Sequence, residues 1–131
     1  MLLARALQLF MPGKPQIWYL DLFAGKNDIE AALRGGSAGH KEINRTNLSQ
    51  EAIEAALEKD VVKKQLELLR MRNTCKAFAF DAEFAIAQPE KHILEMSWSK
   101  DGAKATLRAD LTTFAFEIEA DMSEGKFSFK Q

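Results

Sequence analysis

Near residue 75 the spacing of the apolar residues changes, and this change restricts the folds open to the chain. Before it, apolar residues recur three and four positions apart, as from Leu2 to Phe10, a stretch that Pro12 and Gly13 bring to an end. After it, apolar and polar residues alternate, which is typical of antiparallel strands with one buried and one solvated face. The pattern predicts an α+β fold, with a mainly helical part over residues 1–74 and an antiparallel β domain over residues 75–131.

The first part is expected to hold several helices and one buried strand. Ser49 is a suitable N-cap for one of the helices, and glycines make much of residues 21–47 loop-like. The run Gln16–Leu20 is short, continuous and apolar, which fits a strand buried on both faces. Helices are predicted at residues 2–10, 28–33, 50–58 and 61–73.

The second part is expected to form about five strands joined by tight turns. Asp101-Gly102 predicts a hairpin, and Glu124-Gly125 predicts a further turn. The apolar sides of these strands need a cover, so the helices should pack on one face of the sheet. The apolar members of the alternating stretches are Phe78, Phe80, Phe84, Ile86, Leu94, Met96, Trp98, Leu107, Ala109, Leu111, Phe114, Phe116, Ile118, Phe127 and Phe129.

Composition excludes several classes of protein. The 131 residues are 47% apolar and 28% charged with a formal net charge of −1, so no basic face is expected for nucleic acid or an anionic membrane. No apolar run reaches the ~18–20 residues that span a bilayer. The first ten residues faintly resemble a signal peptide, but Arg5 interrupts them and Pro12 stands near the expected cleavage site. The single cysteine, Cys75, excludes an internal disulfide and fits a reducing, cytoplasmic location.

One glycine-rich loop carries the residues best suited to bind an anion. His40, Lys41 and Arg45 follow one another closely in this loop. Cationic side chains on a loop could hold a phosphate or a carboxylate through charge-assisted hydrogen bonds. The alternative is a solvated loop with scattered charge.

Carboxylates and aromatic residues at and after residues 16–20 form a second candidate set. Asp21, Asp28 and Glu30 could orient sugar hydroxyls, and Trp18 and Tyr19 could stack on a sugar ring. The alternatives are that Asp28 caps a helix and that the two aromatic residues belong to the core. The carboxylates have no His or Cys partner at ligand spacing, so neither a metal nor another cofactor is expected.

Outside these segments the residues provide no catalytic constellation. His92 opens an alternating stretch and is expected at the surface. Cys75 has no neighbouring His in the sequence and is expected to be buried or inert. Nucleophile-elbow and phosphate-loop motifs are missing, so no catalytic residue is assigned.

Two segments carry a resemblance to a known family. They are Phe10-Met-Pro-Gly-Lys-Pro-Gln-Ile-Trp-Tyr-Leu-Asp-Leu-Phe-Ala-Gly-Lys-Asn-Asp28 and Gly39-His-Lys-Glu-Ile-Asn-Arg-Thr-Asn-Leu48. Together they resemble the C-terminal third of the sucrose and sucrose 6-phosphate phosphorylases, retaining family-13 glycoside hydrolases of the α-amylase superfamily. That group has similar Pro-Gly-x-Pro-Gln-x-Tyr-Tyr, Ala-Gly-x-Asn-Asp and Ile-Asn-Arg motifs. The helix expected at 61–73 also fits the group, and the β part matches mainly in its alternating pattern of apolar and polar residues.

The resemblance implies a place for each segment. Residues 16–20 would be the last strand of a (β/α)8 barrel, and residues 1–11 the helix before it. Residues 21–48 would form the loop at the catalytic face, and residues 49–73 the closing helices. The implied fold class is α+β, the last strand and helices of a barrel followed by a small antiparallel sheet at residues 77–131.

The resemblance also implies an activity. Members of the group transfer glucose from sucrose or sucrose 6-phosphate to phosphate with retention, through a carboxylate nucleophile and a Glu acid/base. Both groups lie on earlier barrel strands, so residues 1–131 are expected to lack turnover. The implied substrate-binding residues are Asp28, His40, Lys41 and Arg45. Lys41 stands where the sucrose form has Arg, and the loop looks more like the sucrose 6-phosphate branch, so His40 and Lys41 would meet the extra phosphate.

Several roles stay open for the chain itself. It is expected to be a C-terminal fragment of such a phosphorylase. Alternatively, it is a free-standing binding or oligomeric interaction module derived from one, or it complements a separately encoded barrel fragment. A strand at residues 16–20 without barrel neighbours would be an open edge, so a homo-oligomer formed through it is expected. The expected ligand is a sugar or a sugar phosphate.

Overall fold

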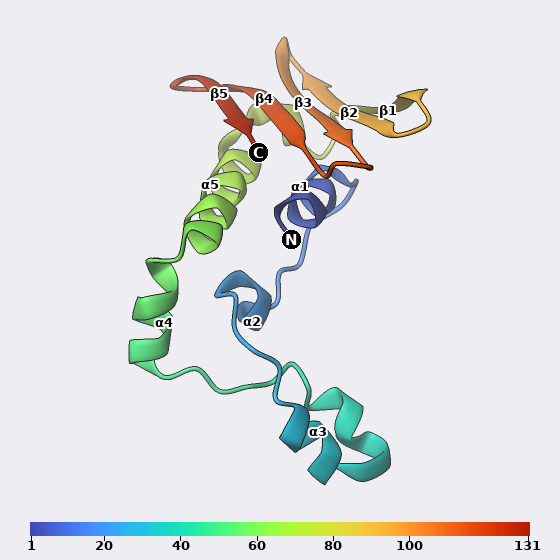
Figure 1. The fold of residues 1–131 in the computed structure, drawn as a ribbon. Helices are drawn as coiled ribbons and strands as arrows, with labels where there is room; N and C mark the ends of the chain where they lie inside the picture. The colour runs from blue at the N-terminus through green and yellow to red at the C-terminus, as the bar shows by residue number, and fades with distance from the viewer. The chain divides into compact units, whose positions relative to one another are not determined.

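Helices fill the first part of the chain and five strands fill the second (Figure 1). A computed structural model describes all residues, 1–131. The helices are α1 (Leu2–Phe10), α2 (Tyr19–Leu22), α3 (Ile29–Arg34), α4 (Gln50–Leu57) and α5 (Asp60–Thr74), with short 3-10 helices η1 (Gly36–Lys41) and η2 (Lys76–Phe78). The strands are β1 (Glu83–Glu90), β2 (Ile93–Lys100), β3 (Ala103–Asp110), β4 (Phe116–Met122) and β5 (Gly125–Lys130). The predicted change from helix to strand near residue 75 is confirmed.

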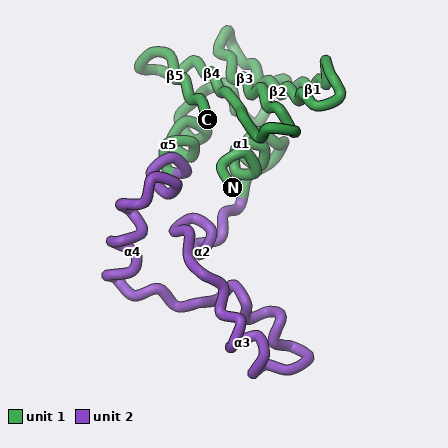
Figure 2. The backbone as a smooth tube through the Cα atoms, viewed as in Figure 1, with its two compact units in different colours: residues 1–15, 66–131 green, residues 16–65 purple.

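The chain forms two compact units (Figure 2). Unit 1 combines residues 1–15 with residues 66–131, and unit 2 comprises residues 16–65. The sheet therefore shares its unit with helix α1 and with the second half of α5. All the residues proposed above for substrate binding fall in unit 2.

The sheet of unit 1 is an antiparallel meander with strand order β1-β2-β3-β4-β5. The predicted hairpin at Asp101-Gly102 is confirmed, with φ of 49° and 82° at these two residues, as a type I′ turn requires. Alternation is also confirmed, because every second residue is buried over 105–109 in β3 and over 116–120 in β4. These buried residues are Ala105, Leu107, Ala109, Phe116, Ile118 and Ala120.

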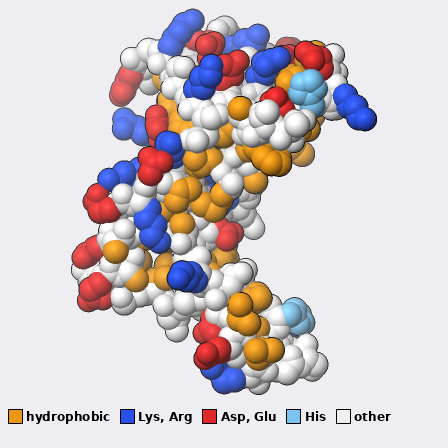
Figure 3. Space-filling model, in the orientation of Figure 1, with side chains coloured by type: hydrophobic (Ala, Val, Ile, Leu, Met, Phe, Trp, Pro, Cys, Tyr) orange, Lys and Arg blue, Asp and Glu red, His pale blue; other side chains and the backbone are white.

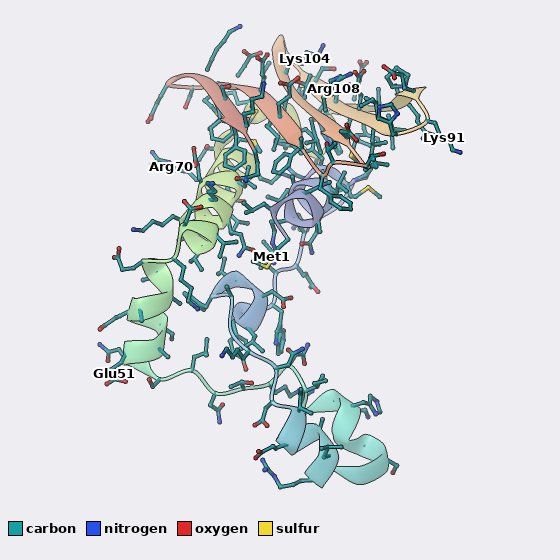
Figure 4. All side chains as sticks on the ribbon, in the orientation of Figure 1. Met1, Glu51, Arg70, Lys91, Lys104 and Arg108 are labelled. Atoms are coloured by element: carbon teal, nitrogen blue, oxygen red, sulfur yellow. The ribbon has the colours of Figure 1, made fainter.

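The other face of the sheet is polar and solvated. Figure 3 shows side chains of both charges over the strands, and Figure 4 shows Lys104 and Arg108 projecting from β3. Arg108 donates from Nε to Glu95 Oε1 on the neighbouring strand at 3.2 Å. Exposed pairs of this kind contribute about 0–1 kcal/mol, so this face adds solubility more than stability.

Helix α1 lies against the buried face of the sheet, with contacts to β2 and β3. Leu9 and Phe10 are fully buried. The indole Nε1 of Trp98 on β2 donates to the carbonyl oxygen of Phe10 at 2.7 Å. This hydrogen bond satisfies one of the last carbonyls of α1, which have no partner within the helix.

Arg72 on α5 satisfies further carbonyls of the same segment. Its Nε donates to the carbonyl oxygen of Leu9 at 2.7 Å, and its Nη2 donates to that of Gly13 at 3.2 Å. Its guanidinium also lies 4.1 Å from the ring centroid of Phe78 and 5.8 Å from that of Trp98. Burial lowers the pKa of Arg72 from its ordinary value, yet the group stays charged at neutral pH. One side chain therefore joins α1, α5, η2 and the sheet.

The strand predicted at residues 16–20 is wrong, whereas the assignment of this segment to the end of a barrel stays a prediction. Residues 16–18 pair with no strand, and the helix α2 begins at Tyr19. A strand needs hydrogen-bond partners alongside it, and all five strands of the chain lie in the sheet of unit 1. The backbone instead bonds locally, because the N–H of Leu22 donates to the carbonyl oxygen of Trp18 at 3.0 Å. The described structure contains no barrel.

Two of the alternating stretches are also shorter than predicted. Phe78 belongs to η2, and Phe80 is fully exposed before β1 begins. Phe114 lies in the turn between β3 and β4, where its φ is 64° and its side chain is exposed. The alternation of these residues with small or polar neighbours reflects turns rather than strands.

The turn between β3 and β4 predicts a pH dependence of stability. Backbone N–H groups of Thr113 and Thr112 donate to Asp110 Oδ1 at 3.1 and 2.8 Å, and these hydrogen bonds hold the pKa of Asp110 below its ordinary value. The stabilisation is therefore present above the unfolded-state pKa of about 3.9 and is lost as pH falls through the folded-state pKa. The free energy of unfolding of Asp110→Asn, measured in urea, should decrease less steeply as the pH falls below about 4 than that of the unchanged chain. Parallel pH profiles would contradict this role of Asp110.

Candidate functional site

The loop with the candidate cations is held against a short helix by close backbone packing. Helix α3 is followed at once by η1, and a Cβ on Gly39 would lie 1.7 Å from the carbonyl oxygen of Ala32. Gly35 is equally confined, because its Cβ would lie 2.5 Å from the Cα of Gly39. Only glycine fits at Gly39, and this close approach fixes the position of the backbone that leads into His40 and Lys41.

Hydrogen bonds to backbone carbonyls tie down the rest of the loop. The indole Nε1 of Trp18 donates to Asn44 at 2.6 Å, and the Tyr19 hydroxyl donates to Thr46 at 2.9 Å. The Thr46 hydroxyl donates to the carbonyl oxygen of Lys26 at 2.8 Å. Residues 44–46 are thus attached to the segment 18–26.

These contacts give Trp18 and Tyr19 a role that the sequence analysis missed. The two residues had been assigned either to sugar stacking or to the core. Trp18 keeps 44% of its surface exposed while its indole N–H is fixed on the loop. Their spacing carries no signal of this role, because the hydrogen-bond partners lie 26 and 27 residues away in the chain.

Asp28 is the N-cap of α3, the structural alternative that the sequence left open. Its Oδ1 accepts from the backbone N–H of Ala31 at 2.8 Å. Its own backbone N–H donates to the carbonyl oxygen of Ile43 at 2.8 Å, so the start of α3 is joined to the candidate loop. A contact of Asp28 with substrate stays a prediction.

The three candidate cations are exposed and differ in their partners. Arg45 Nη1 lies 3.3 Å from Glu42 Oε1. His40 Nδ1 lies 3.2 Å from the carbonyl oxygen of Ser37, where a ring N–H can donate. Lys41 ends η1 with an exposed side chain. An exposed ion pair costs little to exchange, so Arg45 can leave Glu42 for an incoming anion.

The other acidic residues of the second candidate set take part in structural contacts, Glu30 through its carboxylate and Asp21 through its backbone. Glu30 Oε2 lies 3.6 Å from Arg34 Nη1, one turn along α3. The carbonyl oxygen of Asp21 accepts from the buried side chain of Gln65 at 3.2 Å.

The remaining reactive side chains lie in unit 1. Cys75 is buried, as expected; its Sγ donates to the carbonyl oxygen of Asp121 at 3.4 Å, and burial raises its pKa. His92 is partly exposed and lies 3.8 Å from Glu90 on the preceding strand. No three His, Cys, Asp or Glu residues converge where a metal ion would be held.

Known proteins similar to this chain are sucrose phosphorylases and their close relatives. The chain is 53% identical over 116 residues to the sucrose 6(F)-phosphate phosphorylase of Ilumatobacter coccineus, a match that covers 88% of this chain and 22% of that protein. It is 38% identical over 104 residues to the sucrose phosphorylase of Bifidobacterium adolescentis, covering 79% of this chain and 20% of that protein. No family model matches the chain.

A solved structure gives the same result. The crystal structure of sucrose 6F-phosphate phosphorylase from Thermoanaerobacter thermosaccharolyticum matches with a TM-score of 0.85 and 37% identity, over 99% of this chain and 26% of that one. The chain thus spans only about a quarter of the length of that protein. None of its helices is both long and apolar enough to cross a membrane. Over nearly its whole length, the chain resembles the C-terminal portion of sucrose and sucrose 6(F)-phosphate phosphorylases.

Proposed function

We propose that the chain is the C-terminal part of a glucoside phosphorylase that acts on sucrose or sucrose 6-phosphate. The reaction breaks the glycosidic bond of the substrate and forms a bond from the same glucosyl carbon to a phosphate oxygen, giving glucose 1-phosphate. The observation that carries the proposal is the 53% identity to a sucrose 6(F)-phosphate phosphorylase, because the matched 88% of this chain must include most of unit 2.

The share of the chain in this reaction is binding rather than bond breaking. Retaining glycosyl transfer needs a nucleophilic carboxylate and an acid/base about 5–5.5 Å apart. In unit 2, Asp28 is engaged as a helix cap and Glu30 is paired with Arg34. We therefore assign substrate contacts to His40, Lys41 and Arg45, and expect no turnover from residues 1–131 alone.

The test of this assignment uses an exchange of segments. The matched C-terminal segment of the Ilumatobacter coccineus phosphorylase is replaced by this chain, and Lys41→Ala is introduced into the resulting chimaera. Loss of a charged hydrogen bond to phosphate should lower kcat/KM for sucrose 6-phosphate by about 10–100-fold. The value for sucrose should change by less than about threefold.

Lys91→Ala is the matched control, because Lys91 is an exposed lysine in the turn between β1 and β2. It should leave both substrates unaffected. Equal losses for sucrose and sucrose 6-phosphate in Lys41→Ala would remove the phosphate-binding role.

A second candidate function is a homo-oligomeric sugar-phosphate-binding module that works without the rest of an enzyme. Unit 1 favours it, since the sheet already buries a core against α1 and η2. In this case residues 16–20, where Trp18 is partly exposed, would contact a second copy.

The expected results for this candidate are two. Light scattering should give a dimer or larger species at micromolar concentration, and millimolar sucrose 6-phosphate should raise the Tm. A clean monomer whose Tm does not respond to the sugar phosphate would exclude it.

A further inference from the structure

Unit 2 buries too little apolar surface to be stable by its own packing. Among residues 16–65, the buried hydrophobic side chains are those of Leu20, Ala56 and Val62. A segment of this length needs a larger core to offset the conformational entropy lost when it is ordered. Something outside residues 16–65 must therefore cover part of this unit.

Four exposed hydrophobic residues of unit 2 mark the uncovered surface, here named the α3 patch. They are Trp18, Ile29, Leu33 and Ile43, with exposed fractions of 44%, 63%, 77% and 37%. Isolated exposed hydrophobic residues are common, but a connected group on one surface indicates a binding site. Figure 3 shows hydrophobic side chains gathered over the region of α3.

Backbone and side-chain contacts link the segments that carry the four residues. Ile29 and Leu33 are four positions apart on α3, so they share one face of that helix. The hydrogen bond between the N–H of Asp28 and the carbonyl oxygen of Ile43 places Ile43 beside the start of the same helix. Trp18 reaches the next residue along, Asn44, through its indole N–H. The four residues of the α3 patch therefore belong to segments that are tied to one another beside the candidate loop.

The length of the related proteins identifies the occupant of the patch. The backbone of this chain, unit 2 included, recurs with a TM-score of 0.85 in a sucrose 6F-phosphate phosphorylase of which it covers 26%, so about three quarters of that protein lies outside the match. A segment that keeps its fold with so small a core of its own is expected to be held by this remaining part.

We propose that the α3 patch is the docking surface for the rest of a sucrose phosphorylase chain. The surface would serve whether that part belongs to the same polypeptide or to another. The inference rests on the proposed function, and it adds the partner and the residues that bind it. Since the patch borders residues 40–45, docking would also complete the anion site.

Co-expression tests this docking directly. The Ilumatobacter coccineus phosphorylase is truncated before its matched C-terminal segment and produced together with the affinity-tagged chain. We expect a one-to-one complex with the unchanged chain and at least about tenfold less complex with Leu33→Glu, because docking would bury a charge in place of a leucine. Phe80→Glu is the matched control, as Phe80 is fully exposed and belongs to unit 1, and it should bind as well as the unchanged chain.

A second measurement covers the case in which the truncated enzyme does not fold. In the intact chimaera, Leu33→Glu should lower the Tm by several degrees and Phe80→Glu should not. Equal effects of the two substitutions in both experiments would overturn the assignment. So would a tagged chain that binds only itself, together with a chimaera whose Tm does not change with Leu33→Glu. A complex that depends on Leu33 but forms no glucose 1-phosphate would support the docking surface and contradict the proposed function instead.

Discussion

Replacing Arg72 with alanine is expected to lower the free energy of unfolding by about 3 kcal/mol. The substitution removes the donors to the carbonyl oxygens of Leu9 and Gly13 and the contact with the ring of Phe78. Leu9 is fully buried, so its carbonyl oxygen would lose its side-chain partner without ready access to water. Urea unfolding followed by far-ultraviolet circular dichroism measures the loss.

Arg70→Ala is the control for this substitution. Arg70 is on the same helix, but its side chain is 77% exposed and its contact with Glu124 is 4.0 Å long. Its removal should cost less than about 0.5 kcal/mol. Similar losses for the two arginines would mean that Arg72 does not join α1 to the sheet in solution.

Replacing Gly39 with alanine is expected to unfold the turn that carries His40 and Lys41. The added methyl group would stand 1.7 Å from the carbonyl oxygen of Ala32, and the nearest atoms all belong to the Ala32 backbone, so no side chain could move aside. The cost of such overpacking is about 3 kcal/mol, more than a short helix and turn can lose. Amide hydrogens of residues 29–41 should then exchange at the rates of an unfolded segment.

Gly36→Ala separates steric conflict from backbone strain. Gly36 has a φ of 55°, and a Cβ there would meet nothing within 4 Å. The left-handed conformation costs an alanine about 1 kcal/mol, so exchange should accelerate only about fivefold. If Gly39→Ala exchanged no faster than Gly36→Ala, the close approach of η1 to α3 would be contradicted.

The sheet could be predicted from the sequence because its determinants are local. Alternation of apolar residues sets the faces of β3 and β4, and Asp101-Gly102 sets the hairpin between β2 and β3 through its positive φ angles. The N-caps Ser49 and Asp28 were equally readable, since each accepts from an N–H three residues further on.

The error at residues 16–20 has a different origin. An apolar run reports that a segment is buried, but not what buries it or which backbone pairs with it. Without a neighbouring strand the segment closes its own hydrogen bonds in α2, and Trp18 and Tyr19 donate to a loop far along the chain. The roles of Arg72 and Trp98 were hidden for the same reason, because their carbonyl partners lie 63 and 88 residues away.

The chimaera described above tests the central claim most directly. Glucose 1-phosphate is measured from sucrose 6-phosphate and inorganic phosphate, with the chimaera and the 131-residue chain assayed side by side. We predict that the chimaera retains activity within about tenfold of its parent enzyme, a barrier difference of about 1.4 kcal/mol, and that the chain alone forms no product. A folded but inactive chimaera, or turnover by the chain alone, would contradict the assignment of residues 1–131 to the binding part of a phosphorylase.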